Sequence, residues 1–344
     1  MSTTTPTSTP PAPMPPASTP LWQQALAYRP PRRYVPVLAT LLLLLVMYTI
    51  GVSQYRAFSD VQVIFNVFID NGFLLIVAVG MTFVILTGGI DLSVGSVVAM
   101  TTMIASAMLQ DGAYPAWFVL IVCLTVGPTL GFLMGCVIHY FHIQPFIVTL
   151  AGLFFARGVC TWIDTSSIPI TDPFWTFMAQ QRIRFSGNFV SISVIIAFVL
   201  VAIAMYVLAY TRIGRNTYAV GGNEQSALLM GLPVGRTKIA VYTISGFCSA
   251  LGGIVLSFYT GSGNPLIAIG MELDAIAAVV IGGTLLTGGS GYVLGTVFGV
   301  LVLGIIQTLI TFDGRLSSWW TKMVIGALLF AFILLQRLLS LRKT

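Results

Sequence analysis

The residues best able to take part in chemistry form a glycine-rich motif with a single carboxylate. Residues 87–96 read TGGIDLSVGS, and residues 287–296 read TGGSGYVLGT. Each copy follows a leucine and lies between two apolar stretches. Hydrophobic segments interrupted by glycine in both halves of a membrane chain indicate a transport site, although tight helix packing also uses glycine. The residues predicted to form a gate on a translocation path are Gly88, Gly89, Asp91, Ser93, Gly95, Gly288 and Gly289.

Two charged residues stand within otherwise apolar surroundings. Asp91 could lie in the membrane interface, or it could bond backbone groups freed near Gly88, Gly89 and Gly95 and hold a gate in one state. Arg157 is costly in lipid, so we expect it to face protein, water or an acidic partner. Asp164 is an alternative partner for Arg157 if the helix continues that far.

The composition places these residues in a membrane protein. Residues of the types AVILMFWYC make up 57% of the chain and charged residues 8%, with a mean hydropathy of +0.95, whereas roughly a quarter of a soluble domain is charged. The net charge of +6 does not indicate nucleic-acid binding, because the basic residues gather at span ends and in connecting loops. This distribution predicts that both termini are cytoplasmic. The cysteines have no metal-ligand spacing. His139 and His142 could share a helix face as metal ligands, but no nearby Asp or Glu completes a site, so no metal site is predicted, and the spans carry no catalytic constellation.

The hydrophobic pattern predicts an all-α polytopic membrane protein with about ten transmembrane helices and an internal repeat. The expected spans are 34–54, 72–88, 91–109, 117–138, 146–163, 190–210, 239–259, 274–286, 292–311 and 319–335. Whether the repeat is parallel or inverted stays open. Residues 1–31, rich in Pro, Thr and Ser, predict a disordered cytoplasmic tail. Residues 32–344 then form the transmembrane domain.

The central basic loop, residues 211–237, is predicted to be cytoplasmic and to hold a short helix. Asn223 suits its N-cap, and Gly231 and Pro233 end it. A helix this short is unstable alone in water, so its apolar residues either lie on lipid headgroups or dock in a groove of a cytoplasmic partner. The residues assigned to this contact are Gly222, Asn223, Glu224, Ala227, Leu228, Met230 and Gly231, with Leu229 beside them.

Three stretches carry a resemblance to a known family: residues 80–96, 219–223 and 278–284. From about Tyr34 to its C-terminus the chain resembles the permease subunit of bacterial ABC sugar importers of the ribose, xylose and galactoside branch. Residues 270–276 and 312–322 are most similar to a permease of the galactofuranose importer. The proline-rich N-terminal extension departs from the short leader that is usual in the family.

The resemblance implies a multi-pass inner-membrane permease that works in a complex. Its partners would be a second, identical or homologous permease, a cytoplasmic ATPase and a periplasmic sugar-binding protein. The chain lacks the phosphate-binding pattern G-x-x-x-x-G-K-[ST], so it is predicted not to be an ATPase itself, and ATP and any cofactor would bind to the partner. Residues expected along the sugar path are Asn66, Asn71, Gln144 and Arg157, with Glu272 and Asp274 at the outer mouth.

An ion-coupled secondary sugar transporter is the alternative interpretation. A transporter of that class needs a titratable carboxylate within the transport path, and Asp91 is the strongest candidate. In the ABC interpretation, closure of the ATPase would instead pull the helices of the central loop and switch the gates at the glycine motifs.

Overall fold

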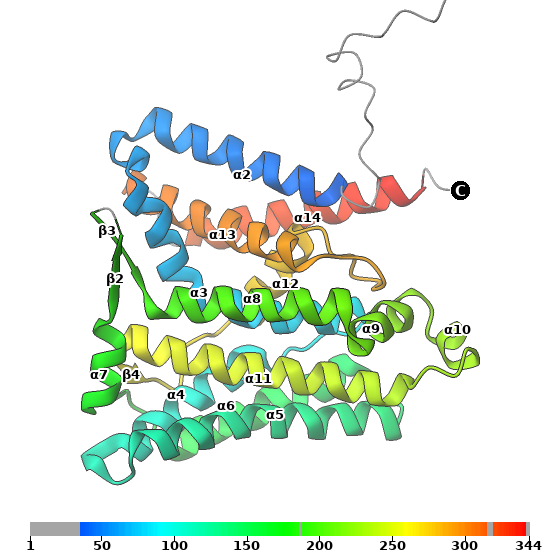
Figure 1. Cartoon of the computed structure of the whole chain (residues 1–344), viewed down its shortest axis with the longest axis horizontal. Coiled ribbons are helices and arrows are strands. Elements are labelled where there is room, and N and C mark those ends of the chain that lie inside the picture. Colours follow the sequence, from blue (N-terminus) through cyan, green and yellow to red (C-terminus); the bar gives the residue numbers. More distant parts are fainter. Residues whose placement is uncertain (1–34, 186, 315–318, 342–344) are drawn as a thin grey trace, which may run out of the picture. The chain divides into compact units, whose positions relative to one another are not determined.

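The computed structural model describes residues 35–185, 187–314 and 319–341 and shows a bundle of long helices (Figure 1). The predicted tail, residues 1–31, lies outside the described residues. Eight helices are long and apolar enough to cross a membrane. These are α2 (Val35–Gln54), α3 (Val61–Leu86), α4 (Val94–Leu109), α5 (Ala116–Tyr140), α6 (Pro145–Ile163), α8 (Ile192–Tyr210), α11 (Val234–Thr260) and α13 (Val293–Asp313). Two further apolar helices, α12 (Met271–Ile281) and α14 (Trp319–Leu341), do not belong to these eight.

The predicted all-α polytopic fold is confirmed, and each predicted span overlaps one of these helices, although the eighth, 274–286, extends five residues beyond the end of α12 at Ile281. The second span is wrong at its start, because α3 begins at Val61 and not near Gly72. Asp60 caps α3 by accepting a hydrogen bond from the Gln62 backbone N–H at 3.0 Å. Asp70, which the sequence interpretation placed in an outer connection, therefore lies inside the helix.

The short elements gather at the two ends of the long helices. The hairpin of β2 (Arg182–Phe185) and β3 (Asn188–Ser191) and helix α7 (Pro173–Gln180) lie at one end, which we call the hairpin end (Figure 1). Helices α9 (Arg212–Gly222) and α10 (Glu224–Leu229) lie at the other, the α10 end (Figure 1). Two short helices, η2 (Arg56–Ser59) and η3 (Gln110–Gly112), occupy turns, and β1 (Ile168–Pro169) pairs with β4 (Ser262–Gly263).

Helices α3 and α11 form the antiparallel centre of the bundle. Gly80 of α3 lies against Cys248 and Ser245 of α11, and Gly252 of α11 lies against Val77 of α3. Small residues at such positions let the backbones of membrane helices approach closely. The most apolar window of α3 is 83% buried, against 17% for α2, so α3 is a core element and α2 a peripheral one.

The helices around this central pair form an inverted repeat. Helix α11 packs against α4 and α5, and its counterpart α3 packs against α12 and α13. In the same way, α4 packs against α6 in one half and α12 packs against α14 in the other. Because α3 runs toward the α10 end and α11 runs away from it, the sets α3–α6 and α11–α14 have opposite directions. The two glycine motifs do not correspond in this repeat, since the first follows α3 and the second follows α12.

In each half of the repeat the second helix, α4 or α12, is preceded by non-helical backbone. Residues 87–93 lead from the end of α3 into α4, and residues 264–270 lead from β4 into α12. Helix α12 is about 16 Å long, roughly half the thickness of the hydrocarbon core. Non-helical backbone at membrane depth is tolerated only where protein buries it or where it lines a cavity. These two stretches therefore mark the region where a function is expected.

Candidate functional site

Glycines of three segments converge at the α10 end of the bundle. The Gly289 N–H donates to the Leu86 carbonyl over 2.9 Å, which joins the second motif to the end of α3. A Cβ added to Gly221 of α9 would collide with that carbonyl, and one added to Gly288 would lie 2.7 Å from the Gly88 nitrogen. Gly88, Gly288 and Gly289 have φ of 78°, 84° and 74°, which glycine adopts without steric cost. We name this contact the glycine junction, formed by Gly88, Gly221, Gly222, Gly288 and Gly289, whereas a Cβ added to Gly89 would instead collide with the Tyr242 hydroxyl of α11.

Asp91 fastens the first non-helical stretch to the centre of the bundle. Its carboxylate accepts hydrogen bonds from the Ser93 backbone N–H at 3.0 Å and from the Ser93 hydroxyl at 2.6 Å. The other oxygen accepts from the Ser245 hydroxyl of α11 at 2.7 Å. The side chain is enclosed by protein and only 1% exposed, so its hydrogen-bond partners are protein groups and not lipid headgroups. Its bonds position the start of α4 beside α11.

Gly95 belongs to the first motif but lies apart from the glycine junction. In the first turn of α4 it faces the second non-helical stretch, where an added Cβ would lie 2.7 Å from the Ala268 carbonyl oxygen. The same Cβ would collide with the Glu272 carboxylate. The absence of a side chain at Gly95 therefore permits the two non-helical stretches of the inverted repeat to approach each other.

Helix α9 is bonded directly to the second glycine motif. The Tyr218 hydroxyl donates to the Gly291 carbonyl at 2.9 Å. Burial raises the pKa of Tyr218 to about 12, with a smaller contribution from Tyr292, so the phenol stays protonated and able to donate at neutral pH. With the contact of Gly221, this bond makes α9 the element through which the central loop reaches the motifs.

Helix α10 presents an apolar tip to the outside. Leu228, Leu229 and Met230 are 65%, 88% and 67% exposed, and we call these three residues the α10 tip. The Asn223 side chain caps the helix by accepting from the Ser226 N–H at 2.8 Å, where the sequence predicted the cap. Ala227 is fully buried, so it holds α10 on its own chain and cannot reach a partner.

The remaining predicted residues of this loop have structural positions around the tip. Glu224 forms an ion pair with Lys238 of α11 at 2.6 Å, which fastens the start of α10. Gly231 has a φ of 74° directly after the helix, which fits the predicted C-terminal stop. Gly222 is exposed, and a Cβ there would meet nothing within 4 Å.

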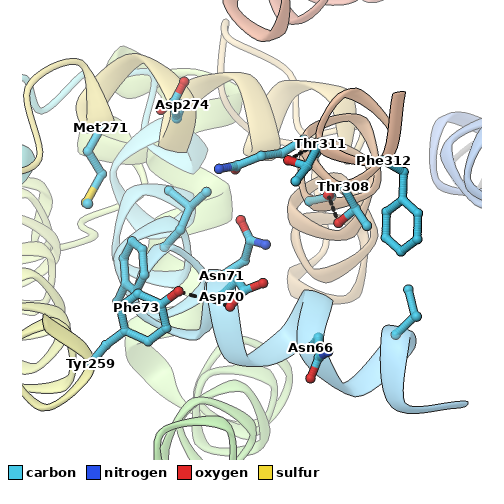
Figure 2. Close-up of a pocket in the computed structure, with 14 residues that line it drawn as sticks. Asn66, Asp70, Asn71, Phe73, Tyr259, Met271, Asp274, Thr308, Thr311 and Phe312 are labelled. Carbon is cyan, nitrogen blue, oxygen red and sulfur yellow. Dashed lines mark hydrogen bonds between the residues drawn. The ribbon is translucent and has the colours of Figure 1, made fainter. Parts of the chain in front are cut away.

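A cavity of about 460 Å³ lies between α3, α12 and α13 in the half of the bundle nearer the hairpin end (Figure 2). The Tyr259 hydroxyl donates to the Asp70 carboxylate at 3.1 Å on one side of it (Figure 2). Its polar lining comprises Asn66, Asp70, Asn71, Tyr259, Asp274, Gln307, Thr308 and Thr311. Its apolar lining comprises Val63, Phe73, Leu74, Met271 and Phe312. Pockets of roughly 300–1,000 Å³ with a few placed polar groups are typical of small-molecule sites.

A second cavity, of about 450 Å³, adjoins the first and extends to α14. The two share Asn71, Leu74, Asp274, Gln307 and Thr311 in their linings. Lys322 of α14 donates to both oxygens of Asp274 at 2.7 and 2.6 Å. This ion pair stands where the two cavities meet.

The structure separates the four residues that the sequence predicted along the path. Asn66 and Asn71 line the first cavity, whereas Gln144 and Arg157 line neither cavity of the described chain. Gln144 precedes α6, and Arg157 donates to the Pro265 carbonyl at 2.7 Å and the Ile267 carbonyl at 2.9 Å. The alternative partner Asp164 bonds locally instead, accepting from the Ser166 N–H.

Sequence reasoning missed several residues that line the cavities: Asp70, Gln307, Thr308, Thr311 and Lys322. The signal that could have found the three residues of α13 is the run of polar side chains Gln307, Thr308 and Thr311 on a largely apolar helix, with Gln307 and Thr311 four residues apart. The carboxylates beside the cavities are Asp70 and Asp274, whereas Asp91, the strongest candidate of the ion-coupled interpretation, lines neither cavity.

Comparisons with known proteins place most of the transmembrane domain in one family. Residues 63–333 match the family model described as "Branched-chain amino acid transport system / permease component". No solved structure gives a significant match to this chain.

Three relatives align over nearly their full length. The chain is 45% identical to the inner membrane ABC transporter permease protein YjfF of Escherichia coli K12, covering 89% of this chain and 93% of the relative. It is 41% identical to the fructose import permease protein FruG of Bifidobacterium longum, covering 89% and 92%. It is 37% identical to the ribose import permease protein RbsC of Haemophilus influenzae, covering 83% and 88%. These matches confirm the resemblance found in the sequence, and the chain belongs to this family of permease components, alongside permeases of ABC sugar importers.

Proposed function

We propose that the chain is the membrane-spanning permease subunit of an ABC importer that carries a monosaccharide across the inner membrane. The observation that carries this proposal is the pair of adjoining cavities, whose shared lining offers amide, hydroxyl and carboxylate groups. Such groups donate and accept hydrogen bonds, as the hydroxyls of a sugar require. The names of the relatives, which include fructose and ribose import permeases, support a sugar as the substrate class.

The sugar we propose is galactofuranose or a related single-ring sugar such as ribose. The first cavity, at about 460 Å³, can hold one sugar ring with water around it, and its mixed polar and apolar lining suits a ring with hydroxyl edges. Weak binding inside the membrane favours release, so we assign the main selectivity to a periplasmic binding protein that docks at the hairpin end. A second permease, identical or homologous, completes the membrane part of the importer.

ATP hydrolysis is assigned to a separate ATPase that docks on the α10 tip. An apolar surface of three exposed residues at the end of a short helix suits insertion into a groove of a partner. This assignment places the α10 end in the cytoplasm, and with it both chain termini. Movement of α10 would reach the glycine junction through α9, because Gly221 and Tyr218 contact the second motif.

The test is sugar-stimulated ATP hydrolysis in proteoliposomes that contain the permease, the ATPase and permease encoded beside it, and the binding protein. Galactofuranose, ribose, xylose and galactose are compared as substrates, with ribitol as a non-cyclic control. We expect one sugar to stimulate hydrolysis together with its own uptake. If no sugar stimulates a correctly assembled complex, the sugar assignment is wrong.

A second arm separates ATP coupling from ion coupling. The permease alone is reconstituted with an imposed pH gradient and no ATPase. The proposal predicts no uptake above that of empty vesicles. Uptake driven by the gradient would instead establish an ion-coupled transporter.

A further inference from the structure

Arg157 joins two parts of the fold that are far apart in sequence. It lies in α6, more than halfway along the helix, and one terminal nitrogen donates to the carbonyl oxygens of both Pro265 and Ile267, at 2.7 and 2.9 Å. Both acceptors belong to the non-helical stretch before α12. Backbone carbonyls without helical partners need donors at membrane depth. A guanidinium, which carries five N–H donors and no acceptor, meets that need.

Apart from the bonds of Arg157, the hydrogen bonds of residues 264–270 in the described chain are local, and Ile267 and Ala268 also pack against the hydrophobic core. The Leu266 N–H donates to the Asn264 side chain and the Ile267 N–H to the Asn264 carbonyl. Pairing of β4 with β1 fixes the chain just before this stretch. The hydrogen bonds that tie the stretch itself to another helix are therefore those of Arg157.

The backbone of this stretch is held in unusual conformations. Ala268 has a φ of 60°, a region that residues other than glycine seldom adopt, and Gly270 has a φ of 82°. Such conformations persist where surrounding contacts hold them and cluster where segments switch. A Cβ at Gly270 would meet nothing within 4 Å, so Gly270 stands in open space at the start of α12 and can act as a hinge.

The position of this stretch controls one wall of the first cavity. Met271 and Asp274, which follow it directly in α12, line the cavity. On the side facing α4, Gly95 lies against the Ala268 carbonyl and the Glu272 carboxylate, and Glu272 also attracts Arg157 electrostatically. A movement of residues 264–270 would displace α12 and with it the cavity wall.

We propose that residues 264–270 form a movable gate segment beside the cavity, and that Arg157 is the positioning residue that fastens this segment to α6 in the closed state. Arg157 contacts the gate backbone, not the sugar. In the other half of the inverted repeat Asp91 also fastens a non-helical stretch, but from within residues 87–93 and to α11. The claim that this gate acts in transport rests on the proposed importer function. The claim that the segment can open does not depend on that function.

The first experiment measures opening directly, without sugar or ATP. Pro265, which is buried, is changed to cysteine in a chain whose four native cysteines are replaced by alanine. A membrane-impermeant maleimide then labels the full complex in vesicles. In the Arg157→Met variant the cysteine at position 265 should react with the maleimide at least about ten times faster than in the chain that keeps Arg157, because hydrogen bonds from a charged donor stabilise the closed state. Arg157→Lys, which keeps the charge but supplies a single donor atom, should fall between them.

The matched control is Arg184→Met, an exposed arginine of β2, which should leave the labelling rate unchanged. Equal labelling rates in the parent chain and in the Arg157→Met variant would contradict the proposal that Arg157 fastens the gate segment. If Arg157→Met fails to assemble, the comparison uses Arg157→Lys, for which an unchanged rate has the same meaning.

A second readout connects the gate to transport. In the proteoliposome assay, Arg157→Met should import several-fold less sugar per ATP hydrolysed, while the sugar preference of the complex stays the same. A changed sugar preference would instead place Arg157 in contact with the substrate. Failure of all uptake in the parent complex would contradict the importer function, and the labelling result would still decide the gate.

Discussion

Asp91 has a structural role that its chemistry makes possible in an apolar bundle. In the described chain its carboxylate forms no ion pair, and its charge is met by two hydroxyl groups and one backbone N–H. A buried charge is stabilised only when it is well hydrogen-bonded. Ser93 and Ser245 are therefore as necessary to this contact as Asp91 itself.

Replacing Asp91 by alanine should destabilise the permease by about 2–4 kcal/mol, because hydrogen bonds to charged groups contribute roughly 1.5–3 kcal/mol each and their buried partners would lose them. The measurement is the midpoint of thermal unfolding of the purified complex in detergent. Asp60→Ala, which removes an exposed helix cap, is the control, with an expected cost of about 1 kcal/mol. Equal midpoints for the two variants would contradict the role of Asp91.

At the scale of single elements, α10 combines a buried anchor with an exposed tip. Ala227 packs with Val220 and Val234, whereas Leu229 on the same helix is 88% exposed. We therefore expect different effects of mutation at these two positions. Ala227 holds the helix on its own chain, whereas Leu229 is free to contact a partner.

Leu229→Asp should weaken binding of the ATPase ten- to a hundredfold, since burying a leucine side chain contributes about 1.5–3 kcal/mol. The fold of the permease should not change, because Leu229 has few contacts in its own chain. Binding of the separately purified ATPase to nanodiscs with the permease measures this. Phe185→Asp, an equally apolar and exposed site at the hairpin end, should bind the ATPase normally. A Leu229→Asp variant that binds it as tightly as the parent chain would refute the docking role.

The sequence predicted the helices better than it predicted where they begin. The start of α3 was placed about ten residues late because Asn66, Asp70 and Asn71 lower the hydropathy there. Those residues line the first cavity, so the same polarity that obscured the helix marks the site. The role of Arg157 was beyond prediction, because its partners are carbonyl oxygens more than a hundred residues away and backbone acceptors leave no trace in side-chain patterns.

At the scale of the whole molecule, the glycine junction is where three remote segments share one contact. The two motifs resemble each other in sequence, which favoured a repeat in which they correspond. Packing relates α3 and α4 to α11 and α12 instead, and this relation could not be read from residue identities. Both motifs contribute glycines to the same crowded backbone contact.

Neighbouring glycines of α9 allow a sharp test of the junction. Gly221→Ala should uncouple ATP hydrolysis from sugar uptake, because the added methyl group would collide with the Leu86 carbonyl and the Gly289 nitrogen. Gly222→Ala, with open space around its added Cβ, should be neutral or slightly stabilising, by up to about 1 kcal/mol. The ratio of sugar imported to ATP hydrolysed measures both variants. Equal ratios would show that the junction does not transmit the movement.

The shortness of α12 also has a consequence for how the protein is made. A helix of about 16 Å cannot span the hydrocarbon core alone, and its preceding stretch leaves carbonyl groups that require Arg157. The nascent chain must therefore already hold α6 in the bilayer before residues 264–281 can settle. Arg157 is synthesised well before residues 264–281. Correct folding of this later segment therefore depends on earlier insertion of α6 into the membrane.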